Sequence, residues 1–281
     1  MLLVAILAAV VLTHSTIPAA AHGADAGADL PDALSTDEII VTALQIPRDK
    51  LPTGVYWNYQ SRLPSKIARE NAQIFLQCAL RSSALESIRE VVDGEPNSAK
   101  ARFAQGWIRK THRGCYPPKG LAEYTMPFTP VTIIDAGRSA LDRGVIIETV
   151  LARYAPDAKL TSEITVSPEV QSRFRQREGF RNRLRLPVDR DALILATCFV
   201  RQQPVLATRL FHSKPGSLLE RGIIQTIIIE GRECIGKASR ITVDPSFTRV
   251  YIIDAFYRWV VAARGVESLI PTAARTALLK R

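Results

Sequence analysis

Apolar residues recur with helical spacing along most of this chain, and polar capping residues mark where helices begin. The pattern predicts helices over 66–81, 84–92, 99–113 and 130–151, and again over 190–202, 204–212, 218–232 and 249–263. Ser98 and Ser217 are each expected to cap the helix that follows. The β-branched run 223–229 would also suit a buried strand, but its counterpart 104–110 would not, which favours a helix. The fold class is therefore mainly α.

Two stretches of the chain match so closely that they indicate a tandem duplication. Residues 128–136 match 247–255 at seven of nine positions, at an offset of 119. Further upstream, Glu38–Thr42 recurs as Glu163–Ser167. Each copy is expected to contain one short strand, an irregular arm and four helices. The predicted units are 38–155 and 156–281.

The four cysteines follow the same repeat. Cys78 and Cys115 are 37 residues apart, and Cys198 and Cys234 are 36 apart. The repeated spacing in an even number of cysteines predicts one disulfide within each unit, Cys78 to Cys115 and Cys198 to Cys234. A zinc site at His112 and Cys115 is the weaker interpretation because the position aligned with His112 is Gly231. No metal or other cofactor is expected.

The first residues of the chain have the features of an export signal. Residues 2–12 are apolar, and Pro18 and the small residues 19–21 follow them, as in a signal peptide with its cleavage site. The run is shorter than the roughly 20 residues that a membrane-spanning helix needs. We expect a signal peptide over 1–21 and a flexible leader over 22–37. No later segment is apolar enough to span a membrane, so a soluble periplasmic or secreted protein is expected.

Composition and charge direct attention to one segment. The 281 residues are 47% apolar, which excludes a disordered chain, and 37 basic against 27 acidic residues give a net charge of +10. Residues 171–190 hold half of that excess. On the predicted extended arm, alternating arginines would present several guanidinium groups on one face, suited to phosphates or carboxylates. The candidate binding residues are Arg173, Arg175, Arg177, Arg181, Arg183 and Arg185, with Arg190 nearby. Candidate partners are anionic lipid, lipopolysaccharide, another polyanion or an envelope protein.

Candidate catalytic residues are few, and no catalytic motif occurs in both copies. Asp135 and Asp254 occupy matching positions within apolar runs, and they are expected to be structural ion-pair anchors, beside the repeated arginines 102/221 and 113/232. His112 and His212 do not match between the copies. A non-catalytic binding or envelope-associated protein is therefore the leading hypothesis. The alternative is a periplasmic hydrolase with one asymmetric site between the units, where a histidine meets a carboxylate.

Two resemblances bear on these hypotheses. The order of cysteine, helix, Pro-x-Ser, helix and cysteine, followed by a capped helix with an Asp-Ala pair, resembles secreted helical proteins of Gram-negative bacteria that have no known activity. It implies an exported helical protein and no site residues. Residues 37–43 resemble the TonB box of outer-membrane receptors, a segment that adds to a partner's strand edge. Because the Glu-Ile-x-Val pattern recurs at Glu163, a structural strand is the preferred interpretation of that segment.

Overall fold

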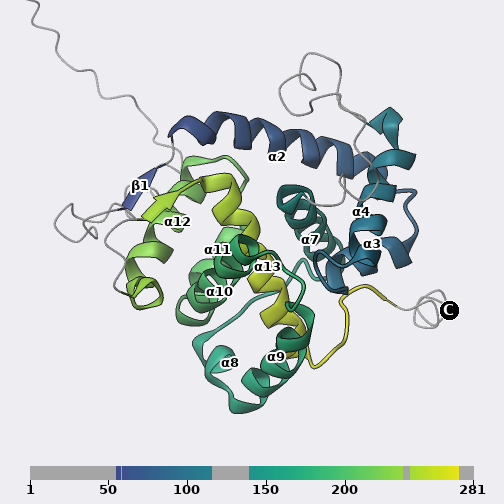
Figure 1. Ribbon diagram of the computed structural model, residues 1–281. Coiled ribbons are helices and arrows are strands. Elements are labelled where there is room, and N and C mark those ends of the chain that lie inside the picture. Colours follow the sequence, from purple (N-terminus) through teal and green to yellow (C-terminus); the bar gives the residue numbers. More distant parts are fainter. Residues whose placement is uncertain (1–54, 58, 116–138, 237–240, 272–281) are drawn as a thin grey trace, which may run out of the picture. The chain divides into compact units, whose positions relative to one another are not determined.

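The computed structural model describes residues 55–57, 59–115, 139–236 and 241–271. All of them lie in the second of the two units into which the chain divides, Ser35–Arg281. The predicted signal peptide, the leader, the TonB-box-like segment, the strand expected at 38–42 and Asp135 lie outside the described residues. What is described is mainly helical, as the apolar pattern predicts (Figure 1).

The first half of the described chain contains four α-helices at the predicted places. They are α2 (Tyr59–Ala79), α3 (Leu85–Asp93), α4 (Ala99–Thr111) and α7 (Ala140–Tyr154), with the short 3-10 helix η2 (Arg113–Cys115) after α4. The part of the last predicted helix before Ser139 lies outside the described residues. Helix α2 begins seven residues before its predicted start at 66.

The second half contains six α-helices. They are α8 (Ser162–Val166), α9 (Pro168–Arg181), α10 (Pro187–Gln202), α11 (Pro204–His212), α12 (Leu218–Glu230) and α13 (Pro245–Arg264), with the 3-10 helix η3 (Arg232–Ile235) after α12. The β-branched run 223–229 is helical, within α12, as its counterpart indicated.

The strand predicted at Glu163–Ser167 is wrong. These residues belong to α8 and the residue after it, and the side chain of Thr161 caps the helix by accepting from the amide of Ile164. Five residues, three of them β-branched, carry too little periodicity to separate a strand from one helical turn. The strands that do form are β1 (Val55–Trp57) and β2 (Ile241–Val243), which pair in parallel with Val55 opposite Ile241.

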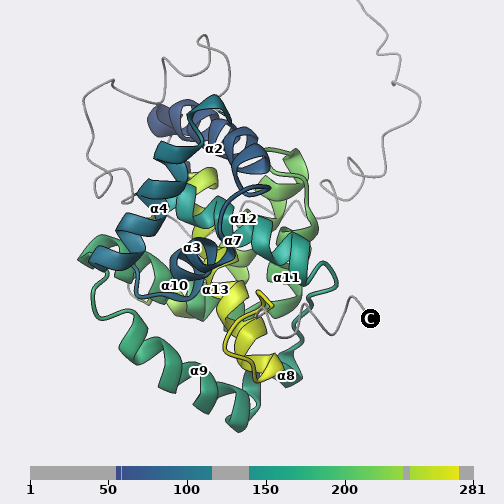
Figure 2. The same ribbon diagram turned by 90° about the vertical axis from the view of Figure 1, so that its right-hand side faces the viewer.

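Helix α13 is the centre of the hydrophobic core. It packs against α7, α10, α2, α9 and α11, and Figures 1 and 2 both show it surrounded by other helices. Buried apolar residues occur on every side of it, among them Ile253, Phe256 and Val260, which is the pattern of a fully enclosed helix. The three charged residues buried within it, Arg249, Asp254 and Arg258, therefore require partners.

Helices α7 and α13 approach closely where one glycine meets one valine. A Cβ atom added to Gly144 would lie 2.3 Å from the Cβ atom of Val250. A side chain at position 144 would therefore force the two helices apart, and glycine at this position permits their close packing.

Caps and disulfides form where the repeat predicted them. The Oγ atom of Ser98 accepts from the amide of Ala101 at 3.0 Å, and that of Ser217 accepts from Glu220 at 3.1 Å. Cys78 is bonded to Cys115 with their Cα atoms 5.6 Å apart, and the corresponding Cα distance for Cys198 and Cys234 is 5.7 Å. Both predicted disulfide pairs are confirmed.

Candidate binding site

The predicted extended arm is wrong, because helix α9 contains the arginines up to Arg181, and Arg183 and Arg185 lie in the turns between α9 and α10. Arg173, Arg177 and Arg181 are spaced four residues apart within α9, which places them on one face. The sequence also alternates Arg-x-Arg, and that alternation suggested a strand-like arm. The two-residue spacing of a strand and the four-residue spacing of a helix thus occur in the same set of arginines. In the helix, the i, i+4 spacing lets these three arginines reach partners at the ends of two other helices.

Two of these arginines bind the C-terminal end of α13 and the residues after it. The Nε atom of Arg173 donates to the carbonyl of Ala262 at 2.8 Å. Arg177 donates to the carbonyls of Val266, at 3.1 Å, and Glu267. The last carbonyls of a helix have no intrahelical donor, so cationic donors there satisfy them and interact favourably with the helix dipole.

The same helix face also binds the C-terminal end of α3. Arg177 donates to the carboxylate of Asp93 at 2.9 Å, and the Nε atom of Arg181 donates to the carbonyl of Gly94 at 2.9 Å. Arg181 also donates to the carbonyl of Val92 and is only 3% exposed. Burial, and then the nearby charge of Arg258, lower the pKa of Arg181. Helix α9 thus ties the ends of α3 and α13 together.

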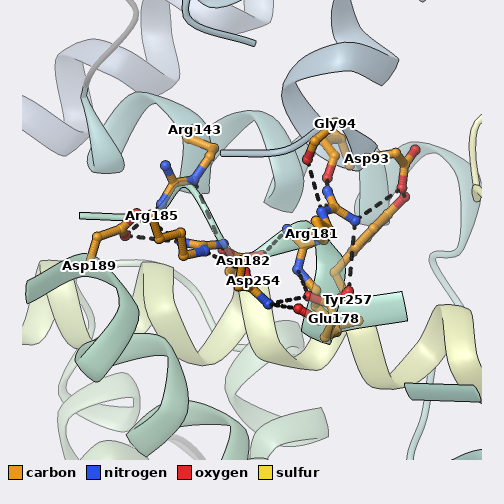
Figure 3. Close-up of polar contacts among 12 residues, drawn as sticks. Asp93, Gly94, Arg143, Glu178, Arg181, Asn182, Arg185, Asp189, Asp254 and Tyr257 are labelled. Atoms are coloured by element: carbon orange, nitrogen blue, oxygen red, sulfur yellow. Dashed lines mark hydrogen bonds and ion pairs between the residues drawn. The ribbon is translucent and has the colours of Figure 1, made fainter. Parts of the chain in front are cut away.

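Asp93 is shared by several donors in this arrangement. Besides Arg177, it accepts from the hydroxyl of Tyr257 at 2.8 Å and from that of Ser268 at 2.6 Å. The carboxylate therefore joins α3, α9, α13 and the segment after α13. Figure 3 shows Asp93 with two of its neighbours, Tyr257 and Arg181. Sequence reasoning missed Asp93, which has no motif around it.

Arg185 occupies a buried ion-pair cluster and is not available to a partner outside the chain. It donates to Asp254 at 2.7 Å, to Asp189 at 3.0 Å and to the side-chain oxygen of Asn182 at 2.7 Å (Figure 3). Arg258 lies 2.6 Å from the other oxygen of Asp254. Charge compensation of this kind makes the burial of Asp254 tolerable.

Asp254 confirms one prediction and corrects another. It is buried and ion-paired, as expected of an anchor. Its described ion-pair partners are Arg185, Arg258 and, at 4.0 Å, Arg143, and not the repeated arginines 221 and 232. Burial alone would raise the pKa of Asp254, but these three guanidinium groups outweigh it and hold the pKa well below the ordinary value.

A second buried cluster joins α2, α7, α12 and α13. The fully buried side chain of Arg249 donates to Glu148 at 2.6 Å, and Arg69 donates to the other oxygen of Glu148 at 3.0 Å. Glu220 lies 3.6 Å from Arg69 and 3.9 Å from Arg249. Burial raises the pKa of Glu220 despite both arginines, whereas at Glu148 the arginines outweigh burial and lower the pKa. The only signal in the sequence was a charged residue within an apolar helical face.

The remaining arginines of the predicted set keep exposed side chains. Arg175 has no ion pair with any described residue, and Arg183 pairs with Glu95, whose carboxylate lies 2.9 Å away. The guanidinium of Arg183 also lies 4.0 Å from the ring centroid of Phe180. Of the six predicted binding residues, Arg173, Arg175 and Arg183 are exposed, Arg177 is half-buried, and Arg181 and Arg185 are buried.

Large apolar side chains are also exposed in the residues that follow these arginines in the sequence. Leu186 and Val188 lie at the start of α10, and Ile194 follows in the second turn, with Arg190 one turn before it. Val188 is 81% exposed, the largest value among the exposed apolar residues described. We call Arg175, Arg183, Leu186, Val188, Arg190 and Ile194 the α9–α10 surface.

A cleft of about 1280 Å³ lies between α3, α9 and the segment that follows α13. We call it the α3–α9 cleft. Its lining includes Arg177, Arg181 and Arg183 of the predicted set, and also Phe180 and Leu184. No histidine or cysteine is among its described lining residues.

The histidines of the hydrolase alternative lie elsewhere. The Nδ1 atom of His112 is 2.9 Å from the carbonyl of Ile108, and the Nε2 atom of His212 is 3.3 Å from the carbonyl of Ala158. Neither forms an ion pair with a described carboxylate. Within the described ranges, no group of three or more potential ligands could hold a metal ion, and no helix there is long and apolar enough to cross a membrane.

Comparisons with protein families, characterised proteins and solved structures found no match to this chain. Function must therefore be inferred from the chain's own residues.

Proposed function

We propose that this is an exported, non-catalytic binding protein that attaches to a phosphate-bearing lipid surface through the α9–α10 surface. The observation that carries the proposal is the combination of exposed apolar side chains with exposed arginines in one short part of the chain. Leu186, Val188 and Ile194 are all more than half exposed, and the exposed Arg190 lies between Val188 and Ile194 in the sequence, one helical turn before Ile194. Proteins that lie on membranes combine these two kinds of residue.

Physical chemistry assigns the two kinds of residue different roles. Apolar side chains at this surface would leave water for the boundary of the acyl chains, and full burial of one such side chain is worth about 1.5–3 kcal/mol. The arginines would meet lipid phosphates, each contributing about 1 kcal/mol near an anionic membrane. The nearest acid to Arg190 is Asp191, 3.8 Å away, and both side chains are exposed. Such a surface ion pair is weak enough to give way to a phosphate.

The proposal narrows the original set of candidate binding residues. Arg177, Arg181 and Arg185 are bonded within the chain, so their substitution would disturb the fold before it disturbed binding. Arg175, Arg183 and Arg190 are the arginines whose exposed side chains can contact a surface.

The architecture we propose is a tandem duplication with units at 38–155 and 156–281. In its support, Ser98 and Ser217 cap α4 and α12 in the same way. Each disulfide joins one helix, α2 or α10, to the 3-10 helix that comes after the next two α-helices, η2 or η3. Helix α7 packs on α2 and α3, as α13 packs on α10 and α11. Export through a signal peptide at 1–21 to the periplasm or the medium completes the proposal.

Sedimentation with lipid vesicles tests the proposed attachment. The mature chain should sediment with vesicles containing phosphatidylglycerol but not with vesicles of phosphatidylcholine alone. It should also sediment with lipopolysaccharide if the phosphates of that lipid bind the arginines as well as those of phosphatidylglycerol do. Added salt should weaken the binding because it screens exposed charges. The triple variant Arg175→Ser, Arg183→Ser, Arg190→Ser should bind at least tenfold more weakly, and so should Leu186→Ser with Val188→Ser.

A matched control removes three exposed cations from another part of the chain. Arg81, Lys110 and Arg113 are exposed and lie near the Cys78–Cys115 disulfide. Replacing all three by Ser changes the net charge equally and should leave most of the binding intact. If both triple variants lost vesicle binding equally, the binding would depend on the net charge of the chain and not on the α9–α10 surface. If the parent chain did not sediment with the vesicles, the proposal would be refuted. Capture by an envelope protein alone would also contradict it.

A further inference from the structure

The α3–α9 cleft is large enough to hold a ligand, and hydrogen bonds fix one of its walls. Its volume of about 1280 Å³ exceeds the roughly 300–1,000 Å³ of pockets for drug-sized molecules. One wall is the segment after α13, which is fixed from two sides. Arg177 donates to the carbonyls of Val266 and Glu267, and Arg89 donates to the carbonyl of Pro271 at 2.9 Å. The cleft is therefore already formed in the protein without a ligand.

The lining combines an apolar surface with a positive charge excess. Tyr154, Phe180, Leu184, Val266 and Pro271 supply apolar area from three separate parts of the chain. Six basic and four acidic residues also line the cleft. A ligand that satisfies both features has an apolar body and an anionic head group.

Three of the basic residues have exposed side chains that could bind a ligand. Lys100, Arg183 and Arg264 have side chains that are 81%, 54% and 37% exposed, and each pairs with a carboxylate. Exposed ion pairs of this kind contribute about 0–1 kcal/mol, so exchange of the protein carboxylate for a ligand anion costs little. Arg89, Arg177 and Arg181 are held by backbone carbonyls and remain part of the wall.

From these observations we propose that the α3–α9 cleft binds a single-chain amphiphile with an anionic head group. The chain of the amphiphile lies against Tyr154, Phe180 and Leu184, and its head group meets Lys100 and Arg264. The carboxylate of a fatty acid and the phosphate of a single-chain phospholipid share this chemistry. The inference goes beyond attachment to a lipid surface and does not depend on it. Of the residues named for the cleft, Arg183 alone also belongs to the α9–α10 surface, and the variants that test the cleft leave Arg183 unchanged.

Calorimetric titration with short amphiphiles below their micellar concentration tests the inference. The full mature chain should bind laurate or dodecyl phosphate saturably. Tighter binding of laurate would indicate a fatty-acid carboxylate as the natural head group, and tighter binding of dodecyl phosphate would indicate a phospholipid phosphate. Dodecyl maltoside, which lacks the charge, and butyrate, which lacks the chain, should each bind at least tenfold more weakly. Absence of saturable binding by both anionic amphiphiles would overturn the proposal.

Variants locate the binding within the cleft. Leu184→Asp, and separately Lys100→Ser with Arg264→Ser, should each weaken laurate or dodecyl phosphate binding at least tenfold. Lys110→Ser with Arg113→Ser removes the same charge elsewhere and should have no effect. If Leu184→Asp lowers the thermal midpoint, Leu184→Ser replaces it. Unchanged affinity in the cleft variants would overturn the proposal, whereas unchanged vesicle sedimentation in the same variants leaves the attachment proposal standing.

Discussion

The guanidinium of Arg177 lies 2.9 Å from the carboxylate of Asp93 and so joins α9 to the end of α3. The same arginine also binds the segment after α13 through backbone carbonyls. The most basic stretch of the sequence is thus a clamp between helices that are far apart along the chain. A partner can contact only the exposed arginines of this stretch, such as Arg175 and Arg183, and not the whole predicted set.

The clamp predicts that neighbouring arginines differ sharply in their contribution to stability. Arg181→Ala should lower the free energy of unfolding by about 3 kcal/mol, because it removes one of the cations that compensate the buried Glu178 and takes the side-chain donor away from the carbonyl of Gly94. Arg175→Ala should change it by less than about 0.5 kcal/mol, since that side chain is exposed. Urea unfolding of both variants measures the difference, and equal effects would contradict the clamp.

The Asp254 cluster predicts a particular dependence of stability on pH. Its arginine neighbours hold the pKa of Asp254 below the ordinary value of 3.8, so the charged carboxylate stabilises the folded state at neutral pH. That contribution is lost as the pH falls below about 4. Asp254→Asn should therefore cost about 3 kcal/mol at pH 7 and progressively less toward pH 3. A constant difference between variant and parent in urea unfolding across this range would refute the assignment.

Two glycines predict opposite effects of the same substitution. Gly144→Ala should destabilise the protein by about 1–3 kcal/mol, because its Cβ atom would collide with Val250. Gly179→Ala lies in α9, where an added Cβ atom meets nothing within 4 Å, and should stabilise the helix by up to about 1 kcal/mol. Thermal unfolding of the two variants checks the sign of each effect. Stabilisation by Gly144→Ala would show that α7 and α13 are not in close contact there.

The two disulfides are expected to contribute similar amounts to stability. They close loops of nearly equal length, with sequence separations of 37 and 36. Replacing either pair by alanine should cost about 3–4 kcal/mol in the chain-entropy model. Chemical unfolding of Cys78→Ala with Cys115→Ala, and of Cys198→Ala with Cys234→Ala, tests this equality. A pair that can be removed without cost would contradict it.

The features that could be predicted from the sequence are those that depend on local chemistry. Ser98 and Ser217 cap helices through an amide three residues away, and the cysteines paired as their repeated spacing indicated. Thr161 marks α8 by the same kind of cap, but the Glu-Ile-x-Val pattern outweighed that signal and led to a strand.

The candidate site was harder to predict because its partners come from distant parts of the chain. Arg177 and Arg181 were predicted to bind an external partner, but both are bonded to residues more than eighty positions away in the sequence, Arg177 to Asp93 and Arg181 to Gly94. Neither the four-residue spacing of the arginines nor their charge shows that acids and carbonyls of another helix lie opposite them. Only packing distinguishes Arg181, which is buried, from Arg175, which is exposed.

A fluorescent probe at position 188 tests most directly whether the α9–α10 surface enters a membrane. Val188→Cys, labelled with an environment-sensitive dye, should show a blue-shifted emission when vesicles containing phosphatidylglycerol are added, and none with phosphatidylcholine vesicles. The same dye at Lys110→Cys, an exposed position outside this surface, should report no change. Unshifted emission at position 188, or an equal shift at position 110, would contradict the account.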